Sequence, residues 1–464
     1  MEFEPTEGQS KLTEKLSAFI AWPQPAVYIL KGYAGTGKTT MISNLVRASK
    51  KLKWKTVLLA PTGRAAKVMS SYSGKPASTI HRKIYLTKKG NNGQIWFERN
   101  VNLHTDSLFI VDEASMIGNE AGLLMSDFES KSLLDDLFEY VFSGRNCKLI
   151  LVGDTAQLPP VGLSVSPALD LENIKYSYEK PSGQFELTEV VRQAAESGIL
   201  FNATRLRLMI AQENAGWPQF KIDGFNDILR IDGMELEDEM QRMWKDYGEE
   251  NVILISRSNK RAYQFNVQIR NRLLWRESEL EAGDRLMVVR NNYFWLKDLE
   301  GSDGFIANGE TVEILKIKAR PELHNCRFAD VNLRMIDQPN SPTIEARIIL
   351  DSIDSDGPGL ASGKMKELYQ SISMDYSNQS SKKIRAEKIK VDPCYNALQV
   401  KFAYAITCHK AQGGQWDAVF IDQGFLKEEM LDIEFLRWLY TAITRAKQKI
   451  YLVNFNAKFF EKEN

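Results

Sequence analysis

The feature that most constrains this chain is a glycine-rich run between an apolar segment (27–31) and a helical pattern (39–52). The run has the spacing G-x-x-x-x-G-K-[ST], which in this context is typical of a phosphate-binding loop, or P-loop. Its glycines let backbone N–H groups surround phosphate oxygens at the positive end of a helix. We expect Lys38 to reach the β- and γ-phosphates and Thr39 to bind Mg²⁺. The expected nucleotide-binding residues are Gly32, Ala34, Gly35, Thr36, Gly37, Lys38, Thr39 and Thr40.

Strands and helices are predicted to alternate along the first half. The nearly unbroken apolar runs typical of parallel strands buried on both faces are VYILK (27–31), TVLLA (56–60), LFIVD (108–112) and LILVG (149–153). They predict an α/β fold with a parallel sheet and helices on both faces. A second such sheet is predicted from the runs at 252–256, 401–407, 418–422 and 450–455.

Two segments interrupt the α/β pattern. Residues 84–100 alternate on either side of Gly90-Asn91-Asn92-Gly93, which predicts an inserted β-hairpin. Residues 285–395 open with two alternating runs and predict a small β-rich insertion in the second α/β unit. Its part from 352 to 390 is expected to be flexible or helical.

A pair of carboxylates, Asp112 and Glu113, ends the third predicted strand. Asp112 is placed to hold Mg²⁺, and Glu113 to orient and deprotonate a water that attacks the γ-phosphate. A solvated acidic turn is the competing interpretation, and the P-loop makes it the weaker one. The two motifs together predict Mg²⁺-dependent hydrolysis of a nucleoside triphosphate.

Composition narrows the class of protein further. The 464 residues include 60 Lys plus Arg and 60 Asp plus Glu, a net charge of zero that argues against a basic, chromatin-like coat. Neither a membrane-spanning run nor a signal peptide is recognisable, and the four cysteines are widely separated. We therefore expect a protein of a reducing, cytoplasmic compartment that does not bind membranes.

Eight segments in a fixed order resemble the superfamily 1 helicases, specifically the RecD/Dda-like branch. They are 32–40, 60–69, 77–82, 112–116, 152–161, 187–193, 407–419 and 440–450. The resemblance covers both α/β units but not 320–395. It implies two RecA-like domains with ATP and Mg²⁺ between them, and single-stranded DNA that crosses both and is travelled 5′→3′.

The resemblance also implies a division of the chain into domains. Residues 1–185 are expected to form the first RecA-like domain, with the hairpin 84–100 as a strand-separating pin. The second RecA-like domain is expected at 186–284 and 396–464, and an SH3-like β-rich domain at 285–395.

Further catalytic roles follow from the same resemblance. Gln157 is expected to sense the γ-phosphate, and Arg192 and Arg445 to reach across the cleft to it. Gln9 is expected to read adenine. Arg192 as a surface residue and Gln9 as part of a helix cap begun by Thr6 are the competing interpretations.

For DNA, the resemblance implies contacts from both α/β units. The expected contact residues are Pro61, Thr62, Thr79, His81, Thr407, His409 and Lys410, with Lys67 as a further source of charge. Trp96 and Phe97 of the hairpin are candidates for stacking on bases, or for packing the hairpin onto its own domain. Gly63 stands where family members often carry His, a departure that argues against base stacking at this position. The basic segment 381–390 is interpreted as a solvated helix face, with DNA contact as the alternative.

The sequence is therefore interpreted as an ATP-dependent DNA helicase or translocase. Its expected partners are single-stranded and forked DNA, with replication or recombination proteins as candidates, and it is expected to work as a monomeric motor. Two alternatives stay open: a superfamily 1 RNA helicase, and a non-catalytic scaffold subunit that binds single strands. The zero net charge predicts few phosphate contacts and a shallow salt dependence of binding.

Overall fold

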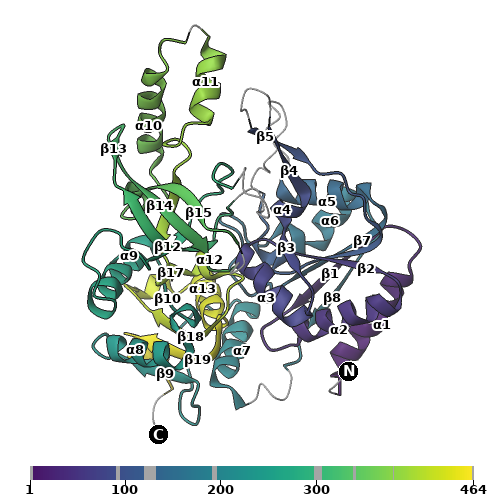
Figure 1. The fold of residues 1–464 in the computed structure, drawn as a ribbon. Helices are drawn as coiled ribbons and strands as arrows, with labels where there is room; N and C mark the ends of the chain where they lie inside the picture. The colour runs from purple at the N-terminus through teal and green to yellow at the C-terminus, as the bar shows by residue number, and fades with distance from the viewer. Residues whose placement is uncertain are drawn as a thin grey trace.

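The computed structural model describes residues 4–89, 95–119, 132–190, 196–296, 306–337, 341–379 and 381–461. Figure 1 shows two α/β units side by side, with a third, mostly antiparallel sheet above the second unit. In the described part of the chain, no helix combines the length and apolarity that a membrane span requires.

The first unit is built on a six-stranded parallel sheet, in the order β3-β2-β6-β7-β1-β8. Its strands are β1 (Val27–Gly32), β2 (Lys55–Ala60), β3 (Ala77–Thr79), β6 (Thr105–Val111), β7 (Arg145–Gly153) and β8 (Ser182–Leu187). Its helices are α1 (Glu7–Ala21), α2 (Lys38–Lys51), α3 (Gly63–Ser73), α4 (Ile80–Ile84), α5 (Leu133–Ser143) and α6 (Leu171–Tyr178). The four predicted strands of this sheet are confirmed.

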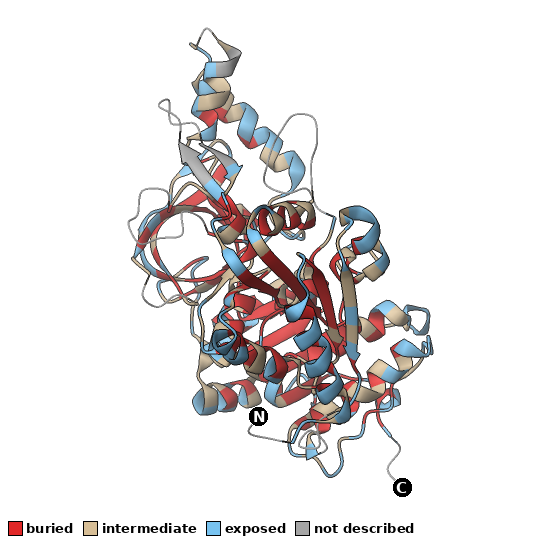
Figure 2. Cartoon of the chain, turned by 90° about the vertical axis from the view of Figure 1, so that its right-hand side faces the viewer, coloured by how far each residue is buried: buried red, intermediate tan, exposed pale blue. Residues whose placement is uncertain are grey.

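Both faces of the first sheet are covered by helices. Along β1, Val27 and Ile29 belong to the apolar cluster on the α5 side, whereas Tyr28 and Leu30 belong to the cluster with α1 and α2. This alternation explains why the strand is an unbroken apolar run. Figure 2 shows the buried strands between helices whose outer surfaces are exposed.

The second unit repeats the parallel arrangement, in the order β17-β10-β18-β19-β9. The strands are β9 (Ile228–Ile231), β10 (Val252–Ser256), β17 (Ala405–Thr407), β18 (Trp416–Asp422) and β19 (Ala446–Val453). The helices are α7 (Gly198–Ala211), α8 (Leu236–Tyr247), α9 (Asn259–Gln268), α12 (Cys408–Ala411) and α13 (Ile433–Ile443).

The prediction of one strand over 401–407 is wrong. Residues 405–407 form β17 of the second sheet, but β16 (Leu398–Phe402) pairs with β11 (Arg285–Val288) and β15 (Ile344–Ile349) of the third sheet. The chain passes between the sheets at Ala403 and Tyr404, where Asn266 binds the backbone of Tyr404 and Ala405 through its side-chain oxygen. A mostly apolar run of seven residues does not reveal that its two ends belong to different sheets.

The third sheet closes on itself. Its order is β12-β11-β16-β15-β14-β13, and a further pairing joins β12 (Thr311–Ala319) to β14 (Cys326–Met335). The remaining strand is β13 (Glu322–Leu323). Helices α10 (Ser362–Asp375) and α11 (Lys382–Lys390) project from it together, at the top of Figure 1. The basic segment 381–390 is thus helical, and its Ile389 packs against α10.

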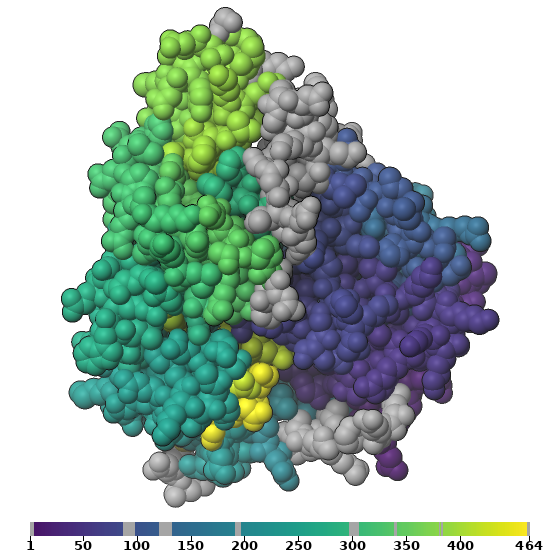
Figure 3. Space-filling view, viewed as in Figure 1, coloured from purple at the N-terminus to yellow at the C-terminus, as the bar shows by residue number. Residues whose placement is uncertain are grey.

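The remaining strands, β4 (Tyr85–Lys89) and β5 (Ile95–Arg99), pair antiparallel with Tyr85 opposite Arg99. They extend from the first unit beside the third sheet (Figure 1). Figure 3 shows the first unit on one side of the molecule and the second and third sheets on the other. The candidate sites lie where these parts meet.

Candidate functional site

The P-loop joins β1 to α2. Gly35 and Gly37 have φ angles of +75° and +84°, in the left-handed region that glycine adopts without strain. The Lys38 ammonium donates to the carbonyl oxygens of Gly32 at 2.5 Å and Tyr33 at 2.9 Å. It therefore lies over the loop whose N–H groups face a phosphate in such folds. Thr39 and Thr40 are exposed in the first turn of α2.

The predicted acidic pair lies at the end of β6. The two oxygens of Asp112 accept hydrogen bonds from the Glu113 N–H at 2.9 Å and from the Tyr72 hydroxyl at 2.6 Å. Glu113 has a φ of +54°, an uncommon conformation for a residue with a side chain. Burial raises the pKa of the Glu113 carboxyl, and the neighbouring Arg445 opposes this shift. A carboxylate with a raised pKa is a better proton acceptor near neutral pH.

Arg445 approaches this carboxylate from the second unit. Its side chain is 4% exposed, and its Nη1 lies 3.7 Å from Oε1 of Glu113. The guanidinium is held by the carbonyl oxygens of Thr441 at 3.0 Å and Gly414 at 3.3 Å. The structure therefore brings together two residues predicted from segments far apart in the chain. Arg192, the other predicted arginine, lies outside the described residues.

Gln157 lies in the loop that follows β7. It is 6% exposed, and its buried Oε1 has no hydrogen-bond partner in the described part of the chain. The next residue is fixed by the second unit: Leu158 receives a hydrogen bond from Gln412 at 2.7 Å and donates one to Thr441 at 2.8 Å. An amide with an unused acceptor, held between two units, suits contact with a ligand in the cleft.

Tyr440 connects the same loop to the P-loop, and the sequence did not single it out. Its hydroxyl, on α13, donates to Asp154 at 2.7 Å and accepts from the Ala34 N–H at 2.9 Å. Burial raises the Tyr440 pKa well above its ordinary value, so the hydroxyl keeps its proton. The residue lies in the segment 440–450 that carried the resemblance, but sequence does not tell where a buried hydroxyl points.

Gln9 forms part of the predicted helix cap and also contacts the P-loop. Its backbone N–H donates to the Thr6 hydroxyl at 3.3 Å and its Oε1 accepts from the Thr6 N–H at 3.2 Å, so it forms a capping box at the start of α1. Its Nε2 also donates to the carbonyl oxygen of Thr36 in the P-loop at 3.2 Å. The cap thus holds Gln9 against the nucleotide loop.

The predicted DNA contacts of the first unit lie after β2 and β3. Thr62 caps α3 and Thr79 caps α4, each accepting from a backbone N–H at 3.2 Å, and Pro61 is half-buried beside Thr62. Burial lowers the pKa of His81 to about 4, so its imidazole is neutral at physiological pH. His81 would therefore contact a strand without contributing charge.

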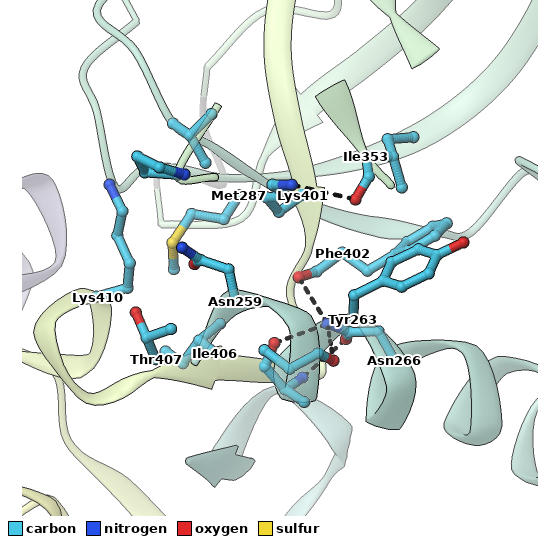
Figure 4. A pocket seen from close by; sticks show the side chains of 14 residues that line it. Asn259, Tyr263, Asn266, Met287, Ile353, Lys401, Phe402, Ile406, Thr407 and Lys410 are labelled. Carbon is cyan, nitrogen blue, oxygen red and sulfur yellow. Dashed lines mark hydrogen bonds between the residues drawn. The ribbon is translucent and has the colours of Figure 1, made fainter. Parts of the chain in front are cut away.

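The corresponding residues of the second unit surround the start of α12. Thr407 and Lys410 line a narrow cavity of about 30 Å³ between α9, β17 and the third sheet. Figure 4 shows them on one side of this cavity, with Lys401 opposite beside Ile353. His409 is exposed on the same turn.

The predicted stacking residues of the hairpin are Trp96 and Phe97. The backbones of Trp96 and Phe97 lie in β5, opposite Lys88 and Thr87. Their side chains lie outside the described part of the structure. Their roles in base stacking or in packing stay predictions.

Two family models match the chain, in order. The one described as an AAA domain matches residues 6–208, and the one described as a UvrD-like helicase C-terminal domain matches residues 402–453. The ATP-dependent RecD2 DNA helicase of Deinococcus radiodurans is 33% identical over 172 residues, which are 37% of this chain and 20% of that protein. The ATP-dependent DNA helicase Dda of Enterobacteria phage T4 is 26% identical over 476 residues, which cover 97% of this chain and 99% of that protein.

In both its family models and its curated relatives, the chain is similar to the RecD/Dda-like branch of the superfamily 1 helicases. It spans about a fifth of the RecD2 protein and nearly all of Dda. A solved structure of the Pif1 helicase from Bacteroides, in complex with ADP-AlF3 and single-stranded DNA, superposes with a TM-score of 0.49 at 17% identity. That superposition covers 99% of this chain and 95% of the other.

Proposed function

We propose that the chain is an ATP-dependent DNA helicase that moves 5′→3′ on single-stranded DNA and unwinds duplex ahead of it. The observation that carries the proposal is the 3.7 Å approach of Arg445, from the second unit, to Glu113 in the first. It supports a nucleotide site that is complete only when two units meet. The names of the RecD2 and Dda relatives support DNA as the substrate.

The residues present fit Mg²⁺ and ATP. The two left-handed glycines, the Lys38 ammonium over the loop, and the Oε1 of Gln157, which has no partner among the described residues, are each suited to a triphosphate. Thr39 and Asp112 would hold Mg²⁺, which neutralises charge on the phosphates when it is bound. Gln9 would approach the adenine from α1.

The chain's own groups then perform the hydrolysis. Lys38 binds the β- and γ-phosphate oxygens, and Glu113 accepts a proton from the attacking water. Arg445 stabilises the negative charge that develops on the transferred phosphoryl group. Gln157 contacts the same group, and Arg192 is proposed as the second arginine.

Movement along DNA requires that hydrolysis changes how the two units meet. In the structure Arg445 lies 3.7 Å from Glu113, and Tyr440 connects Ala34 to Asp154. Loss of the γ-phosphate would weaken the attraction for Arg445 and let the units separate. The strand would be held by Pro61, Thr62, Thr79 and His81 on one unit, and by Thr407, His409 and Lys410 on the other.

The domain limits predicted from the sequence are proposed with two changes. The first domain extends through residue 187, because β8 belongs to the first sheet. The third sheet takes in β16, so the proposed SH3-like domain extends through residue 402. The β4–β5 hairpin is proposed as the pin that separates strands. Proteins that act at replication or recombination forks are the candidate partners of a monomeric motor.

The proposal is tested by unwinding of partial duplexes that carry either a 5′ or a 3′ single-stranded tail. We expect unwinding only with the 5′ tail, and none with either tail after Lys38→Ala. A requirement for the 3′ tail would contradict the polarity. Stimulation of ATP hydrolysis by RNA rather than DNA oligonucleotides would favour the RNA helicase alternative.

A further inference from the structure

A cavity of about 220 Å³ lies where the third sheet meets the first unit. On the first unit it is lined by α3, β3 and α4, which carry the proposed DNA contact Thr79. On the third sheet it is lined by Glu310, just before β12, and Asp337, just after β14. We refer to Glu310 and Asp337, together with Asn308, which lies two residues before Glu310 and outside the cavity lining, as the inner rim.

Asp337 forms an ion pair across this cavity. Its Oδ1 accepts a hydrogen bond from the Lys67 ammonium, on α3, at 3.1 Å. The Asp337 side chain is 7% exposed, and its other oxygen, Oδ2, has no hydrogen-bond partner in the described part of the chain. Burial of a carboxylate costs free energy, and a carboxylate with one oxygen unsatisfied recovers only part of that cost through its hydrogen bonds. This contact is therefore suited to exchange.

A second lysine is held by the inner rim in the same way. The Lys410 ammonium, on α12 of the second unit, donates to Oδ1 of Asn308 at 2.6 Å. Lys67 and Lys410 thus come from different α/β units, and both bind side-chain oxygens of the third sheet. These are the two lysines that the sequence predicts for DNA phosphates, which offer the same kind of acceptor oxygen.

Gly63 provides the space for the Glu310 side chain of the inner rim. A Cβ atom at Gly63 would lie 3.1 Å from Cγ and 3.2 Å from Oε1 of Glu310, closer than most such contacts. Glu310 is 5% exposed. Its carboxylate attracts the positive charge of Arg82, which lines the same cavity. The glycine at this position therefore permits an acidic side chain to lie directly against the proposed DNA path.

We propose that the inner rim is a built-in competitor for DNA, in which Asp337 occupies Lys67 until a phosphate of the strand displaces it. The inference rests on the proposed function, because it concerns the same DNA path. It gives the third sheet a role in release: when a phosphate leaves Lys67, Asp337 replaces it, and the strand does not rebind at once. Lys410 and Asn308 would exchange in the same manner.

The test is binding of a fluorescent thymidine oligonucleotide at low salt, measured by anisotropy, with folding of each variant checked by circular dichroism. Asp337→Asn removes the competing charge and is expected to tighten binding about two- to fivefold, the range for a partly exposed ion pair. The matched control is Glu345→Gln, which makes the same charge change in the same sheet. Glu345 is 73% exposed and pairs with Lys318 instead.

Lys67→Gln supplies the second arm. It should weaken binding. Relative to Asp337→Asn, in which Lys67 is bare, the double variant should lower the slope of affinity against salt by about 0.7, the value for one single-strand phosphate contact. In the Lys67→Gln background, Asp337→Asn should no longer tighten binding, because the two side chains act as a pair.

Three results would overturn the inference alone: wild-type affinity in Asp337→Asn, equal tightening by Glu345→Gln, or tightening that persists without Lys67. The proposed function fails separately, and the inference with it, if wild-type protein neither binds the oligonucleotide nor hydrolyses ATP in its presence.

Discussion

Replacement of Glu310 by Gln should stabilise the protein, and more so at high pH. Glu310 is buried against Gly63, and its carboxylate accepts a hydrogen bond from the Ala307 N–H at 2.9 Å. Burial raises its pKa from 4.5 to about 7, with a further contribution from Asp337, whereas Ala307 and Arg82 act in the opposite direction. Glutamine keeps the acceptor for Ala307 without the charge.

The sign and size of the effect follow from this shift. Between pH 4.5 and 7 the folded protein keeps a proton on Glu310 that the unfolded chain has lost, so stability falls as pH rises through this window. Above pH 7 the full penalty is present, at about 1.4 kcal/mol per pKa unit, or roughly 3 kcal/mol in all. Below pH 4.5 both states are protonated and the penalty vanishes. The gain from Glu310→Gln should therefore grow by about 2–3 kcal/mol between pH 5 and pH 8.

The assay is urea unfolding of wild type and variant at both pH values. Glu345→Gln, at an exposed ion pair, is the matched control, with changes under about 1 kcal/mol expected at either pH. An equal gain from Glu310→Gln at pH 5 and pH 8 would refute the reasoning, since a side chain that does not titrate in this range contributes no pH dependence.

Three further substitutions test other parts of the structure. Arg445→Lys should lower the ATP turnover number by about 10³-fold or more with nucleotide binding retained, because an ammonium cannot reproduce the guanidinium fork; near-normal turnover would contradict the role. Tyr440→Phe removes both hydrogen bonds that connect Ala34 to Asp154 and should raise KM for ATP about tenfold with a smaller change in kcat; steady-state kinetics separates the two. Lys148→Met should cost about 3 kcal/mol in urea unfolding, because the fully buried ammonium of Lys148 binds three carbonyl oxygens at the end of α1; a stability within 1 kcal/mol of wild type would contradict this.

Sequence predicts the parts of the fold in which the role of each residue is set by its neighbours in the chain. The four predicted strands of the first sheet are buried on both faces, so nearly every position is apolar and each run is easily recognised. The P-loop is equally local, because its glycines, lysine and threonine lie within one turn between a strand and a helix. Glu113 and Arg445 were predicted separately, and only the structure shows their 3.7 Å approach.

Sequence does not predict what depends on contacts between distant segments. The run 401–407 divides between two sheets because Asn266, far away on α9, holds the turn between β16 and β17. Tyr440 is one buried tyrosine among several until its hydroxyl is seen between Ala34 and Asp154. Asp337 lies in a region where the family resemblance fades, so no motif marked it.

The inner rim also changes what the zero net charge means. A chain with 60 basic and 60 acidic residues need not lack a basic groove, because acids placed beside the lysines can neutralise it locally. At Lys67 the acid is 3.1 Å away and belongs to a different sheet, so the groove is neutral only while the third sheet stays in place. DNA that displaces Asp337 exchanges one anion for another, and this exchange releases fewer counterions than binding to a bare lysine. A shallow salt dependence in wild type that becomes steeper in Asp337→Asn would therefore arise from competition within the protein, whereas few phosphate contacts alone would leave both slopes equal.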